Sequence, residues 1–444
     1  MKLQIGALLR LSAMVVLALT TAATGAAGQD NAPALPPGQV RPVVAADSAD
    51  ARAVIDRARD KVVQIRTFFG TNSAPLSHGS ALAVGDALFV TNFHVVSDHV
   101  FAPKRNRVEY RTSDGATSGA VTVIAVDVRN DLALVEAQGL NRSALPLQVD
   151  IPAKGARAYS VGFPLDVGLT ITEGVSNGMV DNAFEPRIHY SGPLNGGMSG
   201  GPGLNAAGEV IGVNVSGYFL QQSVAFFVPA AKVADLLASR RLNKPSSDDL
   251  KQDIAKQMRD HSTSLLSALS GTLKTEKSNG YVLPAKLAPF IDCNASGNQS
   301  QGQPYETVRV KCDAKASVFL ERGHQTGDLN YTHVLLSTNK LGAWRFAKVM
   351  GNHSTASGFR GAVKHVGPLT CQQRDVALKG FAANTLLCTR SYRKFEGLYD
   401  FVLQVMSLDG ADQGFISHLD LFAVDYAKGL DFIGRYIGAM EKAP

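Results

Sequence analysis

The sequence lacks a long hydrophobic run, a dense basic stripe and any cysteine in its first half. The apolar stretch near the start, 11–19, is too short for a membrane helix, which needs about 20 apolar residues. Lysine and arginine number 44 against 38 acidic residues. No basic stripe with interleaved aromatic residues occurs, so nucleic-acid binding is not expected. These features indicate a mildly basic globular chain without a stable membrane span.

All four cysteines lie in the second half of the chain, and no C-x-x-C spacing suggests a metal site. An even number of cysteines in an exported chain favours disulfides, for which three pairings exist. We favour the pairs Cys293–Cys312 and Cys371–Cys388, because each closes a short loop between neighbouring strands. Buried free thiols are the alternative. No metal or organic cofactor is expected.

The first 28 residues have the pattern of a secretory signal peptide. Lys2 and Arg10 precede and flank an apolar core, and small residues at 24–28 suit cleavage. An uncleaved membrane anchor is the alternative interpretation. Residues 29–46 are rich in proline and alanine and predict a flexible leader. We therefore expect a periplasmic or secreted protein.

From residue 62 to about 228, short apolar runs alternate with Gly, Asn, Asp and Ser. Many short strands at regular spacing predict a barrel or a sandwich. Helical patterns at 47–60 and 229–240 flank this region, which gives a first domain over 47–243. The second domain, 247–444, is expected to be α+β. Its predicted helices cover 247–270 and 419–440, and its predicted strands include 305–312, 333–337 and 401–406.

Three short motifs in the first domain carry the residue types of nucleophilic catalysis. His94 lies in Thr-Asn-Phe-His-Val-Val, Asp131 in Asn-Asp-Leu-Ala-Leu and Ser199 in Gly-Gly-Met-Ser-Gly-Gly-Pro. A serine hydroxyl needs an imidazole to take its proton, and the imidazole needs a carboxylate to orient it. The alternative interpretation of His94 is a buried histidine with a structural role. Asp98 and Asp127 are the other candidates for the orienting carboxylate. The order His, Asp, Ser is that of chymotrypsin.

The glycines around the candidate nucleophile suit an oxyanion hole, which needs backbone N–H donors aimed at one point. We expect these donors to come from Gly197, Met198 and Ser199, because a glycine at 197 can adopt a positive φ.

Because of these motifs, the region from about 55 to 240 resembles the trypsin-like serine proteases, and more closely their HtrA (Deg-like) branch. The resemblance also includes 79–81, the segments 161–165 and 172–178, and 208–214. It implies a mainly β fold with a double β-barrel, His94 and Asp131 in the first barrel, and Ser199 in the second. It further implies a serine endopeptidase acting on polypeptide substrates. Met198 and Gly196 depart from the residues usual in that branch, and nothing after Ser199 resembles a PDZ domain.

The substrate pocket is expected beside the nucleophile. We assign its lining to the segment before Ser199 and to the strand after it, where no acidic side chain occurs: Pro193, Leu194, Asn195, Asn214 and Ser216. Cleavage after Lys or Arg would lack a counter-charge, so a preference for small or aliphatic residues is predicted.

Two other functions stay open at this stage. The chain could be a latent or non-catalytic scaffold with a trypsin-like fold, or an enzyme that processes its own linker near 244–247. The oligomeric state also stays open.

Overall fold

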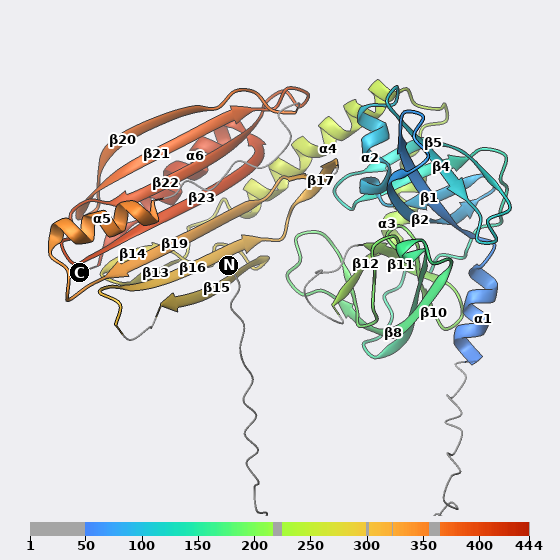
Figure 1. Ribbon diagram of the computed structural model, residues 1–444, viewed down its shortest axis with the longest axis horizontal. Helices are drawn as coiled ribbons and strands as arrows, with labels where there is room; N and C mark the ends of the chain where they lie inside the picture. Colours follow the sequence, from blue (N-terminus) through green and yellow to red (C-terminus); the bar gives the residue numbers. More distant parts are fainter. Residues whose placement is uncertain (1–48, 216–223, 299–301, 322, 355–364, 444) are drawn as a thin grey trace, which may run out of the picture. The chain divides into compact units, whose positions relative to one another are not determined.

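The computed structural model describes residues 49–215, 224–298, 302–321, 323–354 and 365–443 (Figure 1). The chain is mainly β, with two closed six-stranded barrels followed by a further β-rich domain. The expected signal peptide, the leader and Ser216 lie outside the described residues. Among the described helices, none is long and apolar enough to cross a membrane.

The first barrel closes in the order β1-β2-β3-β6-β5-β4. Its strands carry apolar side chains inward in short runs, as in β6, where every residue but one is buried. The helix α2 (Phe93–Phe101) follows β3 directly. The strands are β1 (Val62–Phe69), β2 (Pro75–Gly85), β3 (Leu88–Thr91), β4 (Asn106–Arg111), β5 (Ser118–Asp127) and β6 (Leu132–Ala137).

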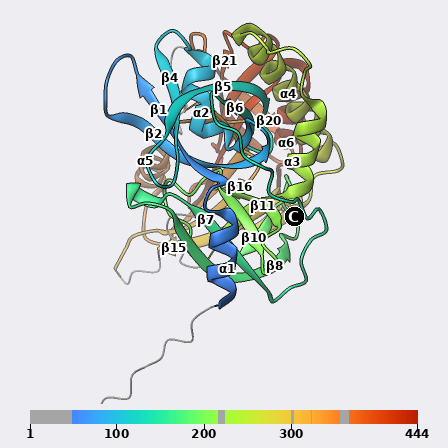
Figure 2. The same ribbon diagram turned by 90° about the vertical axis from the view of Figure 1, so that its right-hand side faces the viewer.

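The second barrel closes in the order β10-β11-β12-β9-β8-β7 (green in Figure 2). A short 3-10 turn, η1 (Pro164–Asp166), joins β7 to β8. The strands are β7 (Ala156–Gly162), β8 (Thr170–Met179), β9 (Ile188–Tyr190), β10 (Pro202–Asn205), β11 (Val210–Val215) and β12 (Ala225–Pro229).

One hydrophobic cluster joins the two barrels. Leu82 and Leu134 from the first barrel and Val161 and Val213 from the second are all completely buried in it. Burial of such side chains stabilises by about 1.5–3 kcal/mol each. The helices α1 (Ala49–Ala58) and α3 (Ala230–Ser239) close this cluster, which holds the barrels together along one face.

The helix α4 (Ser247–Ala268) connects the barrels to the last domain. Ser246 caps it. The Ser246 hydroxyl accepts a hydrogen bond from the Asp249 N–H, and the Asp249 carboxylate accepts one from the Ser246 N–H. This reciprocal pair is a capping box, which satisfies N–H groups that would otherwise lack partners at the start of the helix.

The last domain is built on a seven-stranded antiparallel sheet in the order β15-β16-β19-β23-β22-β21-β20. The helix α5 (Ala343–His353) packs against β23, and α6 (Tyr426–Gly438) packs against β22 and β23. The strands of this sheet are β15 (Ile291–Asn298), β16 (Glu306–Ala314), β19 (Leu329–Ser337), β20 (Thr370–Leu378), β21 (Phe381–Ser391), β22 (Leu398–Ser407) and β23 (Gln413–Asp425).

Two smaller sheets complete the domain. One is the hairpin of β17 (Val318–Glu321) and β18 (His324–Thr326). The other contains β13 (Thr275–Ser278), β14 (Tyr281–Pro284) and β24 (Glu441–Lys442).

A disulfide fastens each outermost strand of the large sheet to its neighbour. Cys293 in β15 bonds to Cys312 in β16, and Cys371 in β20 bonds to Cys388 in β21. This is the pairing that the sequence analysis favoured. The side chains of β20 are mostly exposed, so few apolar contacts hold this edge strand and the covalent bond takes that role.

The helix expected over 419–440 is wrong in its first part. Residues 413–425 form β23, and only 426–438 are helical. β23 lies in the middle of the sheet and eleven consecutive residues, 414–424, are buried. A strand buried on both faces carries apolar residues without strict alternation, so helical spacing can arise by chance.

Candidate active site

His94 and Asp131 meet at the end of the first barrel. β3 ends at Thr91, so His94 lies in the first turn of α2, and Asp131 immediately precedes β6. One carboxylate oxygen of Asp131 lies 2.6 Å from His94 Nδ1, and the other accepts the backbone N–H of His94 at 2.9 Å. Asp131 is 3% exposed. The carboxylate thus holds the imidazole at Nδ1 and leaves Nε2 available.

Asp131 adopts an unusual backbone conformation, with φ at 60°. Its carbonyl accepts hydrogen bonds from Asn92 Nδ2 at 2.8 Å and from the N–H of Phe93 at 3.1 Å. Left-handed φ values are uncommon outside glycine and are kept only where neighbours enforce them. Here the buried Asn92 provides that support and directs the carboxylate toward His94.

Burial and the Asp131 carboxylate together shift the pKa of the His94 imidazole. Burial lowers the pKa of His94, but the negative charge of Asp131 and its hydrogen bond raise the pKa, and the net result lies above the usual 6.5. An imidazole in this setting accepts a proton more readily than one in water.

The loop around Ser199 is fastened to the strand beside His94. The N–H of Ser80 in β2 donates to the carbonyl of Ser199 at 2.7 Å. Gly200, with φ at 86°, lies so close that a Cβ there would be 2.2 Å from the Ser80 carbonyl oxygen and 2.5 Å from Thr91 Oγ1. Only glycine fits at this position, and its close approach brings Ser199 to the β2–β3 edge that leads into His94.

In the described part of the chain, the backbone N–H groups of Gly197 and Ser199 have no protein acceptor. The carbonyl of Gly196 accepts the N–H of Leu165 at 3.0 Å, so the planar peptide turns the Gly197 N–H the opposite way. These two N–H groups suit the role of hydrogen-bond donors to an oxygen atom that becomes negatively charged during acyl transfer.

Met198 differs from the other two expected donors. Its N–H donates to the carbonyl of Asn195 at 3.1 Å, because the loop forms a tight turn there. Its side chain is completely buried. The expectation that Met198 also directs its N–H toward an oxyanion is therefore not met by this geometry.

Ser199 and His94 are not hydrogen-bonded to each other in the described part of the chain. Such bonds are often long without substrate and shorten in the reactive complex. In this site Asp131 holds the imidazole of His94, and the N–H of Ser80 holds the backbone of Ser199. A hydrogen bond between Ser199 and His94 would have to form in the reactive complex.

The expected pocket residues separate into two groups. Asn214 is completely buried, and its side-chain amide donates to the carbonyls of Val161 and Met198 at 3.0 Å each. It supports the serine loop from behind instead of lining a pocket. Pro193 and Asn195 are exposed and Leu194 is half-buried, so these three remain accessible to a substrate.

Sequence reasoning missed two residues that contact the site. Ser80 is buried, and its hydroxyl donates to the carbonyl of Gly197 at 2.8 Å and accepts the N–H of Phe163 at 3.0 Å. Phe319, 225 positions after His94, packs on the imidazole with ring centres 5.2 Å apart. The Gly79-Ser80-Ala81 match drew attention to Ser80 without assigning it a role, and no local pattern marks Phe319.

The described residues contain no group of three or more His, Cys, Asp or Glu side chains that could hold a metal ion.

Comparison with known proteins identifies the region that holds these residues. Residues 79–213 match the sequence model of the trypsin-like peptidase domain. Human serine protease HTRA3 is 28% identical over 237 residues, which cover 49% of this chain and 51% of HTRA3. Bovine mitochondrial serine protease HTRA2 is 32% identical over 204 residues, covering 41% of this chain and 42% of HTRA2. The anti-sigma-I factor RsgI9 of Acetivibrio thermocellus is 28% identical over 192 residues, 43% of this chain and 26% of RsgI9.

The chain thus spans about half or less of the length of these relatives. Among solved structures, the active form of the Rv3671c protease from M. tuberculosis matches with 22% identity and a TM-score of 0.39, covering 48% of this chain and 96% of that one. The HtrA-type protease AlgW with a tripeptide matches with 24% identity and a TM-score of 0.38, covering 43% and 62%. The first part of the chain therefore contains a trypsin-like peptidase domain similar to those of HtrA proteases.

Proposed function

We propose that this trypsin-like peptidase domain is an active serine endopeptidase in which Ser199 is the nucleophile, His94 the general base and Asp131 the orienting carboxylate. The observation that carries the proposal is the His94–Asp131 pair. The Asp131 carboxylate contacts the imidazole Nδ1 at 2.6 Å and accepts the backbone N–H of His94 at 2.9 Å, and the Ser199 loop is hydrogen-bonded to the neighbouring strand β2.

The proposed reaction has two halves. Ser199 Oγ attacks the carbonyl carbon of the scissile peptide while His94 Nε2 takes the hydroxyl proton. The resulting oxyanion lies between the N–H groups of Gly197 and Ser199. Protonated His94 then gives its proton to the leaving amine, and an acyl-enzyme remains. Water, deprotonated by His94, attacks the acyl carbon, and Ser199 recovers its proton as the acid product leaves.

The pocket residues support a preference for small or aliphatic side chains before the scissile bond. The accessible segment 193–195 contributes no acidic group, and Asn214 is committed to the serine loop. A digest of a peptide library with the purified chain tests this preference. Cleavage mainly after Lys or Arg would contradict it.

The chain is further proposed to be exported after removal of residues 1–28. The signal-like pattern and the disulfides, which persist in oxidising compartments, support this proposal. N-terminal sequencing of the chain from an extracytoplasmic fraction tests it, and an intact Met1 there would contradict the cleavage.

The decisive experiment is labelling by a fluorophosphonate probe, which reacts with an activated serine. The purified chain is compared with Ser199→Ala and His94→Ala. Labelling of the unsubstituted chain alone is expected. Equal labelling of all three chains would place the reactive group elsewhere.

A latent form is the second candidate, because Ser199 and His94 lack a mutual hydrogen bond and Phe319 covers part of the imidazole. Absence of labelling, followed by labelling once a peptide is added, would support latency.

A further inference from the structure

Phe319 reaches His94 because the β17–β18 hairpin is built into the core of the first barrel. Val318 and Leu320, on either side of Phe319, are 2% and 0% exposed and belong to the same hydrophobic cluster as Val95 and Val100 of α2. Alternate residues of a strand point to opposite faces. The two aliphatic neighbours therefore anchor the hairpin, and Phe319 is left half-buried against the imidazole.

The base of the hairpin is also held from the side of the last domain. Thr326 Oγ1 lies 2.5 Å from the Tyr392 hydroxyl, and buried Glu321 lies 2.9 Å from His365. His261 of α4 lies 2.6 Å from the carbonyl of Gly327. Residues 48–444 form one compact unit, so these contacts give Phe319 a defined position.

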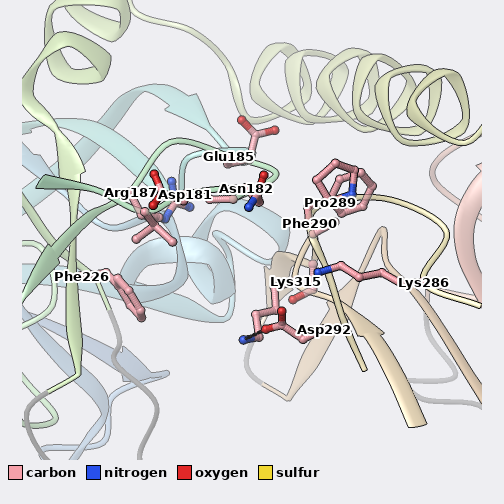
Figure 3. A pocket seen from close by; sticks show the side chains of 14 residues that line it. Asp181, Asn182, Glu185, Arg187, Phe226, Lys286, Pro289, Phe290, Asp292 and Lys315 are labelled. Carbon is pink, nitrogen blue, oxygen red and sulfur yellow. Dashed lines mark hydrogen bonds and ion pairs between the residues drawn. The ribbon is translucent and has the colours of Figure 1, made fainter. Parts of the chain in front are cut away.

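A pocket begins on the same segment, two residues before Phe319. Ala316 and Ser317 line it, and two residues of extended chain span only about 7 Å. Its larger apolar side chains include Phe226 of β12 and Pro289 and Phe290 of the loop before β15 (Figure 3). The cavity therefore lies where the second barrel and the last domain meet, and one of its walls is two residues along the chain from Phe319.

The size and charge of this pocket favour one apolar side chain. Its volume is about 230 Å³, below the range of roughly 300–1,000 Å³ that is typical of small-molecule sites. Glu185 pairs with Arg129 at 2.7 Å, and Asp292 pairs with Lys315, so the acidic groups at these two points of the lining are neutralised.

The remaining charges of the lining are of mixed sign. Asp181 and Lys286 are exposed, and the half-buried Arg187 lies in the electrostatic field of Asp131, Glu185 and Asp127. The whole lining has three acidic side chains (Asp181, Glu185, Asp292) and three basic ones (Arg187, Lys286, Lys315), so no net charge favours a charged occupant, whereas the aromatic rings of Phe226 and Phe290 favour an apolar one.

We propose that the last domain completes the substrate cleft: Phe319 forms the wall of a subsite at His94, and the adjoining pocket binds an apolar side chain of the same polypeptide near its scissile bond. This inference rests on the proposed peptidase function. It assigns to Phe290, Ala316, Ser317 and Phe319 a role in choosing the substrate.

The test compares Phe319→Ala, Phe319→Leu and Phe290→Ala with the unsubstituted chain. Trp344→Ala is the matched control, since this aromatic residue lies in the same domain on α5 and is 92% exposed. Each chain digests a peptide library randomised on both sides of the scissile bond. We expect Phe319→Ala and Phe290→Ala to lose roughly tenfold or more of the preference for apolar over acidic residues at distinct positions. Phe319→Leu should keep most of the preference, and Trp344→Ala all of it.

Two outcomes would overturn the proposal. One is a library profile of Phe319→Ala and Phe290→Ala that superimposes on that of the unsubstituted chain. The other is a uniform rise in kcat/KM for every peptide in Phe319→Ala, which would make the hairpin an obstruction.

A binding measurement separates this inference from the peptidase function. In chains that carry Ser199→Ala, the Kd of a fluorescent apolar peptide is measured with and without Phe319→Ala. A weaker Kd in the double variant supports the cleft even if the unsubstituted chain fails to react with the fluorophosphonate probe. An unchanged Kd contradicts the cleft whatever the probe shows.

Discussion

The N–H of Leu165 donates to the carbonyl of Gly196 at 3.0 Å, and Leu165 adopts a φ of 47° to do so. Because the peptide is planar, this bond turns the next N–H, that of Gly197, away from Leu165. The side chain of Leu165 is 70% exposed, so burial contributes little to its conformation. The residue therefore serves the serine loop through its backbone.

Replacing Leu165 with proline should reduce kcat by about 10²–10³-fold, the range for loss of one oxyanion donor. Proline removes the N–H and fixes φ near −65°, which is incompatible with 47°. Leu165→Gly, which keeps the N–H and tolerates positive φ, is the matched control and should retain kcat. Steady-state kinetics and the unfolding temperature are measured for both. Equal kcat for the two variants would contradict the role of this bond.

Gly200 and Gly196 provide a second matched pair. A Cβ at 200 would lie 2.2 Å from the Ser80 carbonyl oxygen, whereas one at 196 would meet no heavy atom within 4 Å. Gly200→Ala should push Ser199 away from His94 and lower kcat/KM by about 10²-fold or more. Gly196→Ala should leave kcat/KM close to that of the unsubstituted chain. Full activity in Gly200→Ala would show that the serine loop is not fastened as described.

Ser80 is expected to stabilise the loop as well as position it. Ser80→Ala leaves the carbonyl of Gly197 and the N–H of Phe163 without their partner, which costs about 1–3 kcal/mol for a buried group. Ser77→Ala on the same strand, which removes one hydrogen bond of 3.4 Å to Val95, is the control. Urea unfolding should separate the two variants, with only Ser80→Ala showing a clear loss of stability.

The pH profile of kcat/KM should report His94. The imidazole must be neutral to accept the serine proton, and its pKa is raised above 6.5, so kcat/KM should rise with pH through a midpoint above 6.5. Asp131→Asn removes the charge that raises this pKa. The midpoint should move to lower pH, and kcat should fall by about 10⁴-fold. A midpoint that stays in place in Asp131→Asn would contradict the electrostatic role of Asp131.

The disulfides should contribute to stability at the sheet edges. They join residues 19 and 17 positions apart, and loops of this length are stabilised by about 3 kcal/mol in the chain-entropy account. The double variant Cys371→Ala/Cys388→Ala should lower the unfolding temperature and increase hydrogen exchange in β20. Exchange in β3 and β6 should change little, because these strands belong to the first barrel. An unchanged rate in β20 would mean that its hydrogen bonds alone hold the edge.

Much of the peptidase region could be predicted from local sequence. Short apolar runs between turn residues are typical of the two barrels, and the motifs around His94, Asp131 and Ser199 carry the resemblance to trypsin-like proteases. The helix expected over 247–270 also begins at the residue where α4 begins. These features depend on neighbours in the chain, so local patterns contain them.

The helix expected over 419–440 shows where local patterns mislead. The spacing of apolar residues over 419–425 fits both an amphipathic helix and a fully buried strand. The pairing of β23 with β19 and β22 decides in favour of the strand. Asn214 is a second example, because a polar residue on the strand after Ser199 suits a pocket wall, but its buried amide donates to two backbone carbonyls instead.

The sequence by itself determined the glycine turn around Ser199, the short strands of the barrels and the composition of the three motifs, because these follow from backbone freedom and side-chain periodicity over a few residues. The tertiary structure alone decided that Leu165 turns the Gly197 N–H, that Ser80 fastens the serine loop and that Phe319 packs on His94. Those contacts join residues from 31 to 225 positions apart. They form only when packing of the two barrels and the last domain has overcome the entropy of bringing distant segments together.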